Sequence, residues 1–310
     1  MSPTRISSTG ARAARPSTGG DRPPSGSRRL TVITVVLAVV AVIAAVIVAL
    51  VSNDGGDDDA AGGGPVELSH VHGLGVDPGD GEVYAGTHYG LIRVPAEGEP
   101  TLVGDTVQDF MGFTVVGPGH YLASGHPGEG QNAPNNLGLI ESTDGGQTWQ
   151  SLSLAGEADF HALRARHEQV YGYHGGTLMV SDDKKTWQTG AQIALADFAV
   201  SATDPDVILA TTEQGLARST DGGTTFEVVP GAPLLQLVSW PDGELVVGVA
   251  PDGTVHVSED GGASWTQRGS VGEQPQALVA DGDDIYVALD GALLASNDGG
   301  TTFKARYDGR

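Results

Sequence analysis

The sequence of 310 residues contains no cysteine, and only 5% of its residues are aromatic. The absence of cysteine excludes disulfide bonds, thiolate metal sites, a cysteine nucleophile and anchoring through a lipidated cysteine. Basic residues are also scarce, because 16 lysines and arginines stand against 39 aspartates and glutamates, which gives a net charge of −23. A chain this acidic repels phosphate backbones and anionic lipid surfaces, so we expect no nucleic-acid partner.

The few basic residues are concentrated at the N-terminus. Residues 1–29 contain six arginines and one acid among many Ser, Pro and Gly, a composition that predicts a disordered tail. Without this tail the chain has 10 basic and 38 acidic residues, a net charge of −28. The remainder of the chain is therefore even more acidic than the whole.

One long hydrophobic run follows the basic tail. Residues 30–51 contain no charged side chain over 22 positions, which is long enough for a helix to span a membrane. The preceding arginines predict a single-pass anchor in the cell membrane with a cytoplasmic N-terminus. Residues 52–64 form an acidic, Gly-rich linker, and residues 65–310 are expected to be exported. A cleaved signal peptide is the alternative, but the run is long for one and no A-x-A site follows it.

An eight-residue motif, Ser-x-Asp-Gly-Gly-x-Thr/Ser-Trp/Phe, recurs through the exported part. Full copies begin at residues 142, 219, 258 and 296, and a worn copy without the glycines begins at residue 181. Steps of 38 or 39 residues are typical of a β-propeller with one copy in each blade. Short polar side chains and the Gly-Gly pair suit a tight turn, so we predict a structural role for the aspartates. These aspartates are Asp144, Asp183, Asp221, Asp260 and Asp298.

The motif resembles the Asp-box, or bacterial neuraminidase, repeat of sialidases, sortilin-like receptors and photosystem assembly factors. This resemblance implies a β-propeller in which the motif is a structural turn, and one such fold supports many functions. Residues 70–78 read His-Val-His-Gly-Leu-Gly-Val-Asp-Pro. This opening is similar to that of actinobacterial membrane-anchored proteins labelled as glycosyl hydrolases, and the similarity covers residues 65–310.

Residues 65–310 can be divided into six blades. Each blade begins with an inner strand, followed by a turn rich in Asp, Pro and Gly and by a second strand. The sequence therefore predicts an all-β, six-bladed propeller that one transmembrane helix precedes. Blade 1 has residues 95–100 in place of the motif, and blade 2 has an insertion at residues 126–136. Insertions beyond the repeat are frequent positions of function.

Histidine and methionine recur at matching positions in the first three blades. At the start of the inner strand, the six blades in order have His72, Met111, His161, Phe198, Gln236 and Gln276. A second column, at the end of the second strand, has His88, His126 and His174 in blades 1 to 3. We expect His70, His72, His88, Met111, His126 and His161 to form a metal or ligand site. Without cysteine, imidazole favours zinc and a thioether favours copper.

Three aspartates, Asp109, Asp159 and Asp197, are aligned at the entry to the inner strands of blades 2 to 4. Two roles remain open for them. They can orient the imidazoles of a metal site through hydrogen bonds. Alternatively, two of them serve as the paired carboxylates of a glycoside hydrolase. We do not expect a sialidase. That resemblance implies three arginines around a substrate carboxylate, with an Arg-Ile-Pro motif at the start of an inner strand. The similar sequence here, Arg93-Val94-Pro95, lies on a third strand instead.

Three functions are therefore considered. The favoured one is binding of a metal ion, or of a ligand held through it, at the histidine and methionine face of blades 1 to 3. The second is glycoside hydrolysis by the aspartates. The third is a protein-interaction scaffold, as the resemblance to sortilin-like receptors implies. The partner is accordingly a small ligand, a glycan or another protein.

Overall fold

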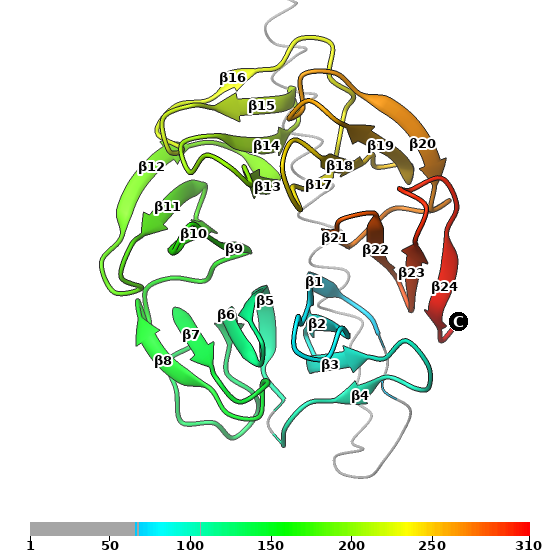
Figure 1. Cartoon of the computed structure of the whole chain (residues 1–310). Helices are drawn as coiled ribbons and strands as arrows, with labels where there is room; N and C mark the ends of the chain where they lie inside the picture. Colours follow the sequence, from blue (N-terminus) through cyan, green and yellow to red (C-terminus); the bar gives the residue numbers. More distant parts are fainter. Residues whose placement is uncertain (1–65, 67, 106) are drawn as a thin grey trace, which may run out of the picture. The chain divides into compact units, whose positions relative to one another are not determined.

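The structure, a computed structural model, describes residues 66, 68–105 and 107–310. In this part of the chain every regular element is a β-strand, and 24 strands form six four-stranded sheets. The sheets are arranged as blades around a central axis, so the prediction of an all-β six-bladed propeller is confirmed (Figure 1). The predicted tail, anchor and linker over residues 1–64 lie outside the described residues. The described part contains no helix that is long and apolar enough to cross a membrane.

Each of the first three blades consists of four consecutive strands. Blade 1 contains β1 (Val71–Val76), β2 (Val83–Thr87), β3 (Gly90–Val94) and β4 (Thr101–Leu102). Blade 2 contains β5 (Asp109–Gly117), β6 (His120–His126), β7 (Leu139–Ser142) and β8 (Gln150–Ser153). Blade 3 contains β9 (Ala162–Arg166), β10 (Gln169–His174), β11 (Thr177–Ser181) and β12 (Gln188–Gln192).

The last three blades follow the same plan. Blade 4 contains β13 (Leu195–Val200), β14 (Ile208–Thr212), β15 (Gly215–Ser219) and β16 (Glu227–Val228). Blade 5 contains β17 (Leu237–Ser239), β18 (Val246–Val249), β19 (Thr254–Ser258) and β20 (Thr266–Ser270). Blade 6 contains β21 (Ala277–Asp281), β22 (Asp284–Leu289), β23 (Ala292–Ser296) and β24 (Lys304–Asp308).

Strand direction gives the ring two distinct mouths. Within each blade the strands pair antiparallel in sequence order, and the first strand is the innermost (Figure 1). First and third strands of a blade consequently run in the same direction. We call the side where the first strands begin the histidine mouth, because the predicted histidine columns lie there. The first strands end at the opposite mouth, and the motif turns, which follow the third strands, lie on that same side.

The apolar core is divided among the blade interfaces. Six clusters of buried side chains lie between neighbouring blades, one cluster for each interface. The aromatic residue that ends each motif packs into the cluster shared with the preceding blade. These residues are Trp149, Trp187, Phe226, Trp265 and Phe303. The motif therefore contributes large apolar side chains to blade packing in addition to forming the turn.

The motif turns are held together by their own side chains. In the first copy, Asp144 Oδ1 accepts hydrogen bonds from Ser142 Oγ at 2.8 Å and from the Thr148 amide at 2.9 Å. Asp144 Oδ2 accepts a third bond from Thr148 Oγ1 at 2.6 Å. Gly146 donates its amide to Ser142 Oγ at 2.8 Å with a φ of 87°, a conformation that favours glycine. The hydrogen bonds from Thr148 and Ser142 lower the pKa of Asp144 to about 2.

The other motif carboxylates are engaged in the same way. Asp221, Asp260 and Asp298 each accept bonds from the hydroxyl and the amide of the Thr or Ser four residues later. These bonds lower the pKa of all three carboxylates to about 2. In the worn copy, Asp183 bonds to the Thr186 amide and hydroxyl, and its pKa is lowered as well. All five carboxylates are thus occupied by their own turns.

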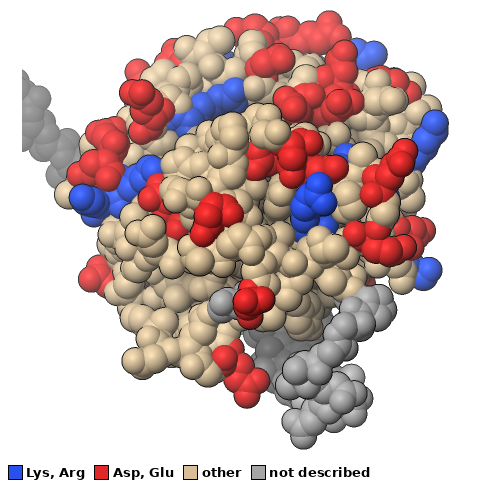
Figure 2. All heavy atoms as spheres, turned by 60° about the horizontal axis from the view of Figure 1, so that its bottom comes forward, with Lys and Arg blue, Asp and Glu red and all other residues tan. Residues whose placement is uncertain are grey.

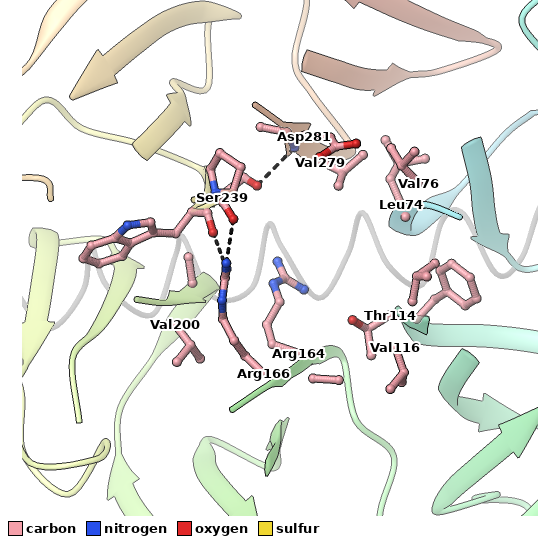
Figure 3. A pocket seen from close by; sticks show the side chains of 18 of the residues that line it. Leu74, Val76, Thr114, Val116, Arg164, Arg166, Val200, Ser239, Val279 and Asp281 are labelled. Carbon is pink, nitrogen blue, oxygen red and sulfur yellow. Dashed lines mark hydrogen bonds between the residues drawn. The ribbon is translucent and has the colours of Figure 1, made fainter. Parts of the chain in front are cut away.

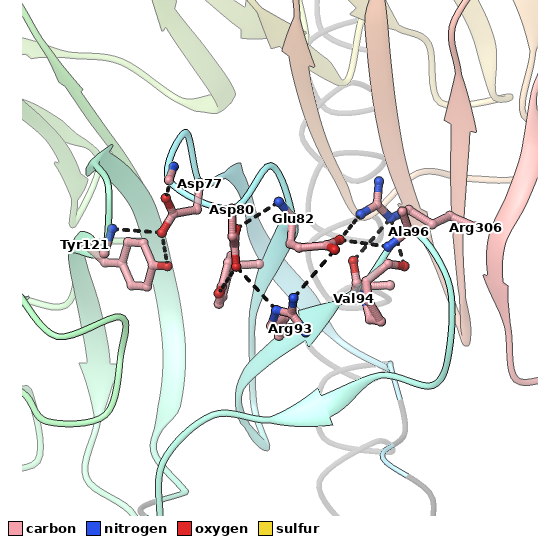
Figure 4. Close-up of polar contacts among 12 residues, drawn as sticks. Asp77, Asp80, Glu82, Arg93, Val94, Ala96, Tyr121 and Arg306 are labelled. Carbon is pink, nitrogen blue, oxygen red and sulfur yellow. Dashed lines mark hydrogen bonds and ion pairs between the residues drawn. The ribbon is translucent and has the colours of Figure 1, made fainter.

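The ring closes between blades 6 and 1 without exchanging a strand. Arg306 on β24 donates to Glu82 Oε2 at 2.5 Å and to the carbonyl oxygens of Val94 and Pro95 at 3.2 Å (Figure 4). Its guanidinium also lies over the ring of Tyr286, 5.2 Å from the centroid. Because blade 1 lacks the motif, this interface adds a charged contact to its apolar cluster, whereas the other five interfaces have a motif aromatic.

The negative charge of the chain is displayed on the propeller surface. Figure 2 shows acidic side chains spread over the face in view, with separate basic side chains among them. Some of the basic side chains are paired, as Arg93 is with Asp80 at 3.4 Å and Arg310 with Glu273 at 2.7 Å. Such exposed pairs contribute little to stability, so the surface is best described as solvated and acidic.

Candidate functional site

The histidines of blade 1 meet because of an irregularity in the innermost strand. The register of the β1–β2 pairing shifts between Val71 and Gly73, which leaves His72 as the extra residue of a β-bulge. Bulges re-aim side chains and are frequent beside functional sites. His88 comes directly after β2 and lies opposite this bulge, with its ring 4.6 Å from the ring of His72 and nearly perpendicular to it. The ring of His70 is 5.2 Å from that of His88.

A carboxylate holds the far side of the His88 ring. His88 Nδ1 lies 2.6 Å from Asp109 Oδ1, and His88 Nε2 lies 3.1 Å from His72 Nε2. Because a carboxylate only accepts, the Asp109 contact places a proton on His88 Nδ1. Of the two facing Nε2 atoms, one donates and the other accepts. The result is a chain of three side chains from blade 2 to blade 1: Asp109, His88 and His72.

The two imidazoles of this chain differ in basicity. Burial lowers the pKa of His72 to about 4, and the neighbouring imidazole of His88 acts in the same direction. The hydrogen bond with Asp109 raises the pKa of His88 against the opposing effect of burial. His72 is therefore neutral near pH 7 and presents an unprotonated nitrogen more readily than His88 does.

A second group of side chains lies at the entry to blade 3. His161 Nε2 is 2.9 Å and His126 Nε2 is 3.5 Å from Asp159 Oδ2. His126 is the first residue of the blade 2 insertion, and its Nδ1 is 2.8 Å from the carbonyl oxygen of Asn135 near the end of that insertion. His174 faces the backbone instead, with Nδ1 2.8 Å from the Asp159 carbonyl oxygen. The insertion therefore helps to position one of the predicted site residues.

Asp159 is buried beneath this second group. Burial alone raises its pKa, but the hydrogen bond with His161 and the histidine charges give a net lowering. The same hydrogen bond raises the pKa of His161. Asp159 Oδ1 has no hydrogen-bond partner among the described residues. This carboxylate is therefore ionised and has accepting capacity left.

The two groups influence each other electrostatically across the histidine mouth. The charge of His161 contributes to the low pKa of His72, and the charge of Asp109 contributes to the raised pKa of His161. Over residues 66, 68–105 and 107–310, however, no three His, Asp or Glu side chains converge as a ready-made metal site. Four of the six predicted residues thus form two pairs of histidines at this mouth, and each pair has its own carboxylate.

The strand register corrects the predicted column of blade 4. Met111 is the extra residue of a bulge in β5, and Ala196 is the extra residue of a bulge in β13. The column that contains His72 and Met111 therefore continues to Ala196, and the alignment with Phe198 is wrong. The structure leaves Met111 half-buried at the histidine mouth.

The expected equivalence of Asp197 with Asp109 and Asp159 is also wrong. Asp197 pairs with Thr211 inside the β13–β14 ladder, whereas Asp109 begins β5. Its carboxylate is buried, accepts a bond from Arg164 Nη2 at 2.6 Å and accepts the Val238 amide at 3.0 Å. Burial raises the pKa of Asp197, while the charge of Arg164 opposes that rise. Asp197 therefore belongs to an interior ion pair.

A cavity of about 500 Å³ opens beside His70 and His72, toward blades 5 and 6. Its other lining side chains include Gln236, Gln274 and Gln276. Gln276 Oε1 accepts the Val71 amide at 2.9 Å, so this glutamine fixes the start of β1. Sequence analysis placed the site only on blades 1 to 3 and missed these amides. The signal was present, since Gln236 and Gln276 stand in the same column as His72.

Comparisons with known proteins support the fold. No family model matches the sequence, and no curated protein matches it. Among solved structures, YCF48 bound to D1 peptide is similar at 17% identity over 78% of this chain and 83% of that one, with a TM-score of 0.47. A chain of the nidogen/laminin complex is similar at 11% identity over 69% of this chain and 88% of that one, with a TM-score of 0.53.

An ancestral GH74 enzyme is also similar, at 13% identity and a TM-score of 0.50. The match covers 78% of this chain but only 39% of that enzyme. At identities this low, the likeness extends to the fold alone. The described part of the chain is therefore an all-β six-bladed propeller with a GH74 enzyme among its structural neighbours, and its resemblance to Asp-box proteins stays a prediction from the motif.

Proposed function

We propose that the propeller binds a zinc or copper ion at the histidine mouth, through His72 and His88. The observation that carries this proposal is the 3.1 Å separation of the two Nε2 atoms. When two nitrogens bind the same zinc ion at about 2.0–2.1 Å, they lie about 2.9–3.4 Å from each other. This range corresponds to N–Zn–N angles between the square and the tetrahedral value. The two imidazoles are thus already spaced as neighbouring ligands, with a shared proton where the ion would bind.

The surroundings of His88 fit this role. A metal-bound histidine usually donates its other N–H to a carboxylate, which fixes the ring and strengthens the ligand. Asp109 accepts from His88 Nδ1 at 2.6 Å in this way. Binding of the ion requires both Nε2 atoms to be free, so the Nε2 proton of neutral His72 would move to its Nδ1. A net proton would be released from a His88 ring that is protonated before binding, because its pKa is raised.

Further side chains that could bind the ion lie at the same mouth. His70 and His161 are the nearest imidazoles, and the half-buried thioether of Met111 would favour copper over zinc. With two pre-spaced ligands and the rest adaptable, the site is suited to an ion that also binds an external ligand. The adjoining cavity, which His70 and His72 line, offers room for that ligand.

Glycoside hydrolysis is less well supported by the same geometry. A hydrolase needs one carboxyl group that stays protonated and a second carboxylate opposite it. Asp159 has a lowered pKa, Asp109 is engaged with His88, and Asp197 is buried against Arg164. The aspartates are therefore better suited to orienting histidines and stabilising the interior.

The test is metal binding by the full-length protein and by His72→Gln and His88→Gln variants. We expect zinc or copper to raise the melting temperature of the wild-type protein, because the ion binds only the folded state. Each variant should bind at least tenfold more weakly. Calcium and magnesium should have no effect, since they prefer oxygen ligands.

The matched control is His256→Gln, which removes a half-buried histidine on β19, away from the mouth. This variant should bind the ion as the wild-type protein does. Metal binding by the His72 and His88 variants that equals that of the wild-type protein would refute the proposal. A melting temperature that neither zinc nor copper changes near neutral pH would refute it as well.

We further propose that residues 30–51 remain as an uncleaved membrane anchor, so that the histidine mouth operates outside the cell. The support is the 22-residue uncharged run and the basic tail before it. Mass spectrometry of the protein from membranes should find the original N-terminal region. A mature N-terminus near residues 50–60 would show that the run is a cleaved signal.

A further inference from the structure

A second cavity, of about 540 Å³, lies at the mouth opposite the histidines. Every blade contributes the last residue of its innermost strand to the lining. These residues are Val76, Gly117, Arg166, Val200, Ser239 and Asp281. The volume falls within the range of roughly 300–1,000 Å³ that is usual for small-molecule sites. The cavity is therefore large enough for a ligand and is separate from the proposed metal site.

Two arginines enter this cavity from blade 3. Arg164 and Arg166 are two residues apart on β9, so their side chains lie on the same side of the strand. Figure 3 shows both guanidinium groups side by side within the cavity. Two arginines in one interior cavity are notable in a chain with a net charge of −23, because its surface offers many acids with which they could pair.

Arg166 is held by backbone rather than by a carboxylate. It donates to the carbonyl oxygens of Trp240 and of Pro241, the latter at 2.5 Å, both in the turn after β17. Among residues 68–105 and 107–310, no carboxylate lies within ion-pair distance of Arg166. Burial lowers the pKa of Arg166, while the charge of Asp242 opposes that shift. The guanidinium is thus partly desolvated, fixed in place and not neutralised by a direct partner.

Arg164 supplies a second fixed donor group. Its Nη2 donates to Asp197 Oδ1 at 2.6 Å and its Nη1 to the Leu163 carbonyl oxygen at 2.7 Å. A guanidinium has five N–H donors, so both arginines have donors beyond the two bonds that each makes within the described residues. The fork geometry of arginine matches a carboxylate or a phosphate group.

The charge of the cavity distinguishes between these two anions. Asp197 pairs with Arg164, and the exposed carboxylate of Asp281 lies at the rim. Among the described residues, Arg166 is therefore the cavity cation that no ion pair occupies, and the carboxylate at the rim repels a phosphate dianion more strongly than a monoanion. The wall across from the arginines is apolar, with Leu74, Val76 and Val116 (Figure 3). A ligand with a hydrocarbon body would bury surface there.

We propose that the cavity binds a small organic monocarboxylate, with its carboxylate on Arg166 and Arg164 and its apolar body against Leu74, Val76 and Val116. The site is independent of the histidine mouth. Affinity should come from hydrogen bonds to two immobile guanidinium groups and from burial of the hydrocarbon part. Specificity should come from the charge, because an uncharged analogue leaves Arg166 without a counter-ion.

The test is equilibrium dialysis of the full-length protein with trans-cinnamate, with cinnamamide as the uncharged analogue of the same shape. We expect saturable binding of cinnamate and at least tenfold weaker binding of cinnamamide. Arg166→Lys keeps the charge but loses the fork, and it should weaken cinnamate binding at least tenfold. Thr114→Asp, a change of similar size on the cavity wall, adds a competing carboxylate and should do the same.

Two controls complete the experiment. Arg268→Gln removes a surface arginine that pairs with Glu259 outside the cavity, and it should bind cinnamate as the wild-type protein does. His72→Gln should also leave cinnamate binding unchanged. Equal affinity for cinnamate and cinnamamide, no saturable binding, or full binding by both cavity variants would overturn the proposal. Displacement of cinnamate by inorganic phosphate at equal concentration would overturn the assignment to a monocarboxylate.

Discussion

The two mouths of the propeller differ in their charged side chains: one has histidines, which titrate near neutral pH, and the other has arginines, which stay charged. At the histidine mouth, side chains that titrate are paired with partly exposed carboxylates, as His88 is with Asp109. At the opposite mouth, two permanently charged arginines are fixed by backbone oxygens and by the buried carboxylate of Asp197. The first arrangement can exchange a proton for a metal ion, whereas the second can only attract an anion.

The two proposed sites also differ in the backbone that carries them. The histidine columns lie where the innermost strands begin, and bulges at His72 and Met111 interrupt the ladder there. The arginines lie on the regular part of β9, where the ladder with β10 is unbroken. We therefore expect substitutions at the histidine mouth to alter binding with little effect on stability, and substitutions around Arg164 to alter stability.

The largest effect should come from two aspartate substitutions that compare the mouths directly. Asp197→Ala removes a buried carboxylate that accepts the Val238 amide, and it leaves Arg164, whose side chain is 28% exposed, without its partner. Breaking a fully buried pair costs about 3–5 kcal/mol, and we expect a loss toward the lower end of that range. Asp109→Ala breaks a pair whose side chains are 27% and 35% exposed, and it should cost less than about 1 kcal/mol. The measurement is the free energy of unfolding in denaturant.

A double substitution sharpens this prediction. Replacing Arg164 by Met together with Asp197→Leu removes both charges, and it should recover most of the lost stability because no buried charge is left unpaired. Equal losses for Asp197→Ala and Asp109→Ala would contradict the distinction between the two mouths.

The next effect concerns metal affinity at the histidine mouth. Asp109→Asn keeps the size of the side chain but weakens the acceptor of His88 Nδ1–H. Loss of such a partner typically lowers metal affinity about 10–100-fold. Zinc and copper titrations of the variant should show this loss, with cinnamate binding at the opposite mouth unchanged. Unaltered metal affinity would mean that Asp109 does not position His88 for an ion.

The sequence predicted the fold from features that are strictly local. The motif spacing indicated the repeat, because each turn is closed by its own carboxylate, as in Asp144, and needs no distant partner. The recurring inner and second strands then gave six blades, including blade 1, which lacks the motif. The histidine columns followed from alignment of the blades, and two of their members, His72 and His88, contact each other. A metal or ligand site there stays a prediction. Side chains at the beginnings of consecutive inner strands meet at one mouth, so spacing alone could bring them together.

The errors arose where register depends on irregular backbone. Asp197-Phe198 looks like Asp109-Phe110, but the bulge at Ala196 moves Asp197 into the ladder, and no residue type marks that bulge. The arginine cavity was missed although Arg164-x-Arg166 on an inner strand was visible. Alternation shows that the two side chains share a face, yet the carbonyl partners of Arg166 lie some 75 residues away in blade 5. Such long-range contacts are set by ring closure, which local patterns do not encode.

The smallest effect should appear in the motif turns, which lie on the same side as the arginine cavity and titrate, unlike the arginines. The pKa of Asp221 is about 2 in the folded protein and 3.8 without the contacts of the fold. The unfolded chain therefore binds a proton more readily than the folded protein does between these two pH values. The contribution of Asp221 to stability is therefore complete above about pH 4 and is lost as the pH falls toward 2. Because the carboxylate is exposed, we expect a small change in stability for each turn.

Asp221→Asn should lower the melting temperature near pH 7 and make its fall between pH 4 and 2 less steep. Thr225→Val removes the hydroxyl bond to Asp221 Oδ2 and should have the same two effects by a smaller amount. Metal and cinnamate binding by both variants should equal those of the wild-type protein. A lowered metal or cinnamate affinity with an unchanged melting temperature would show instead that the turn acts on a site rather than on the fold.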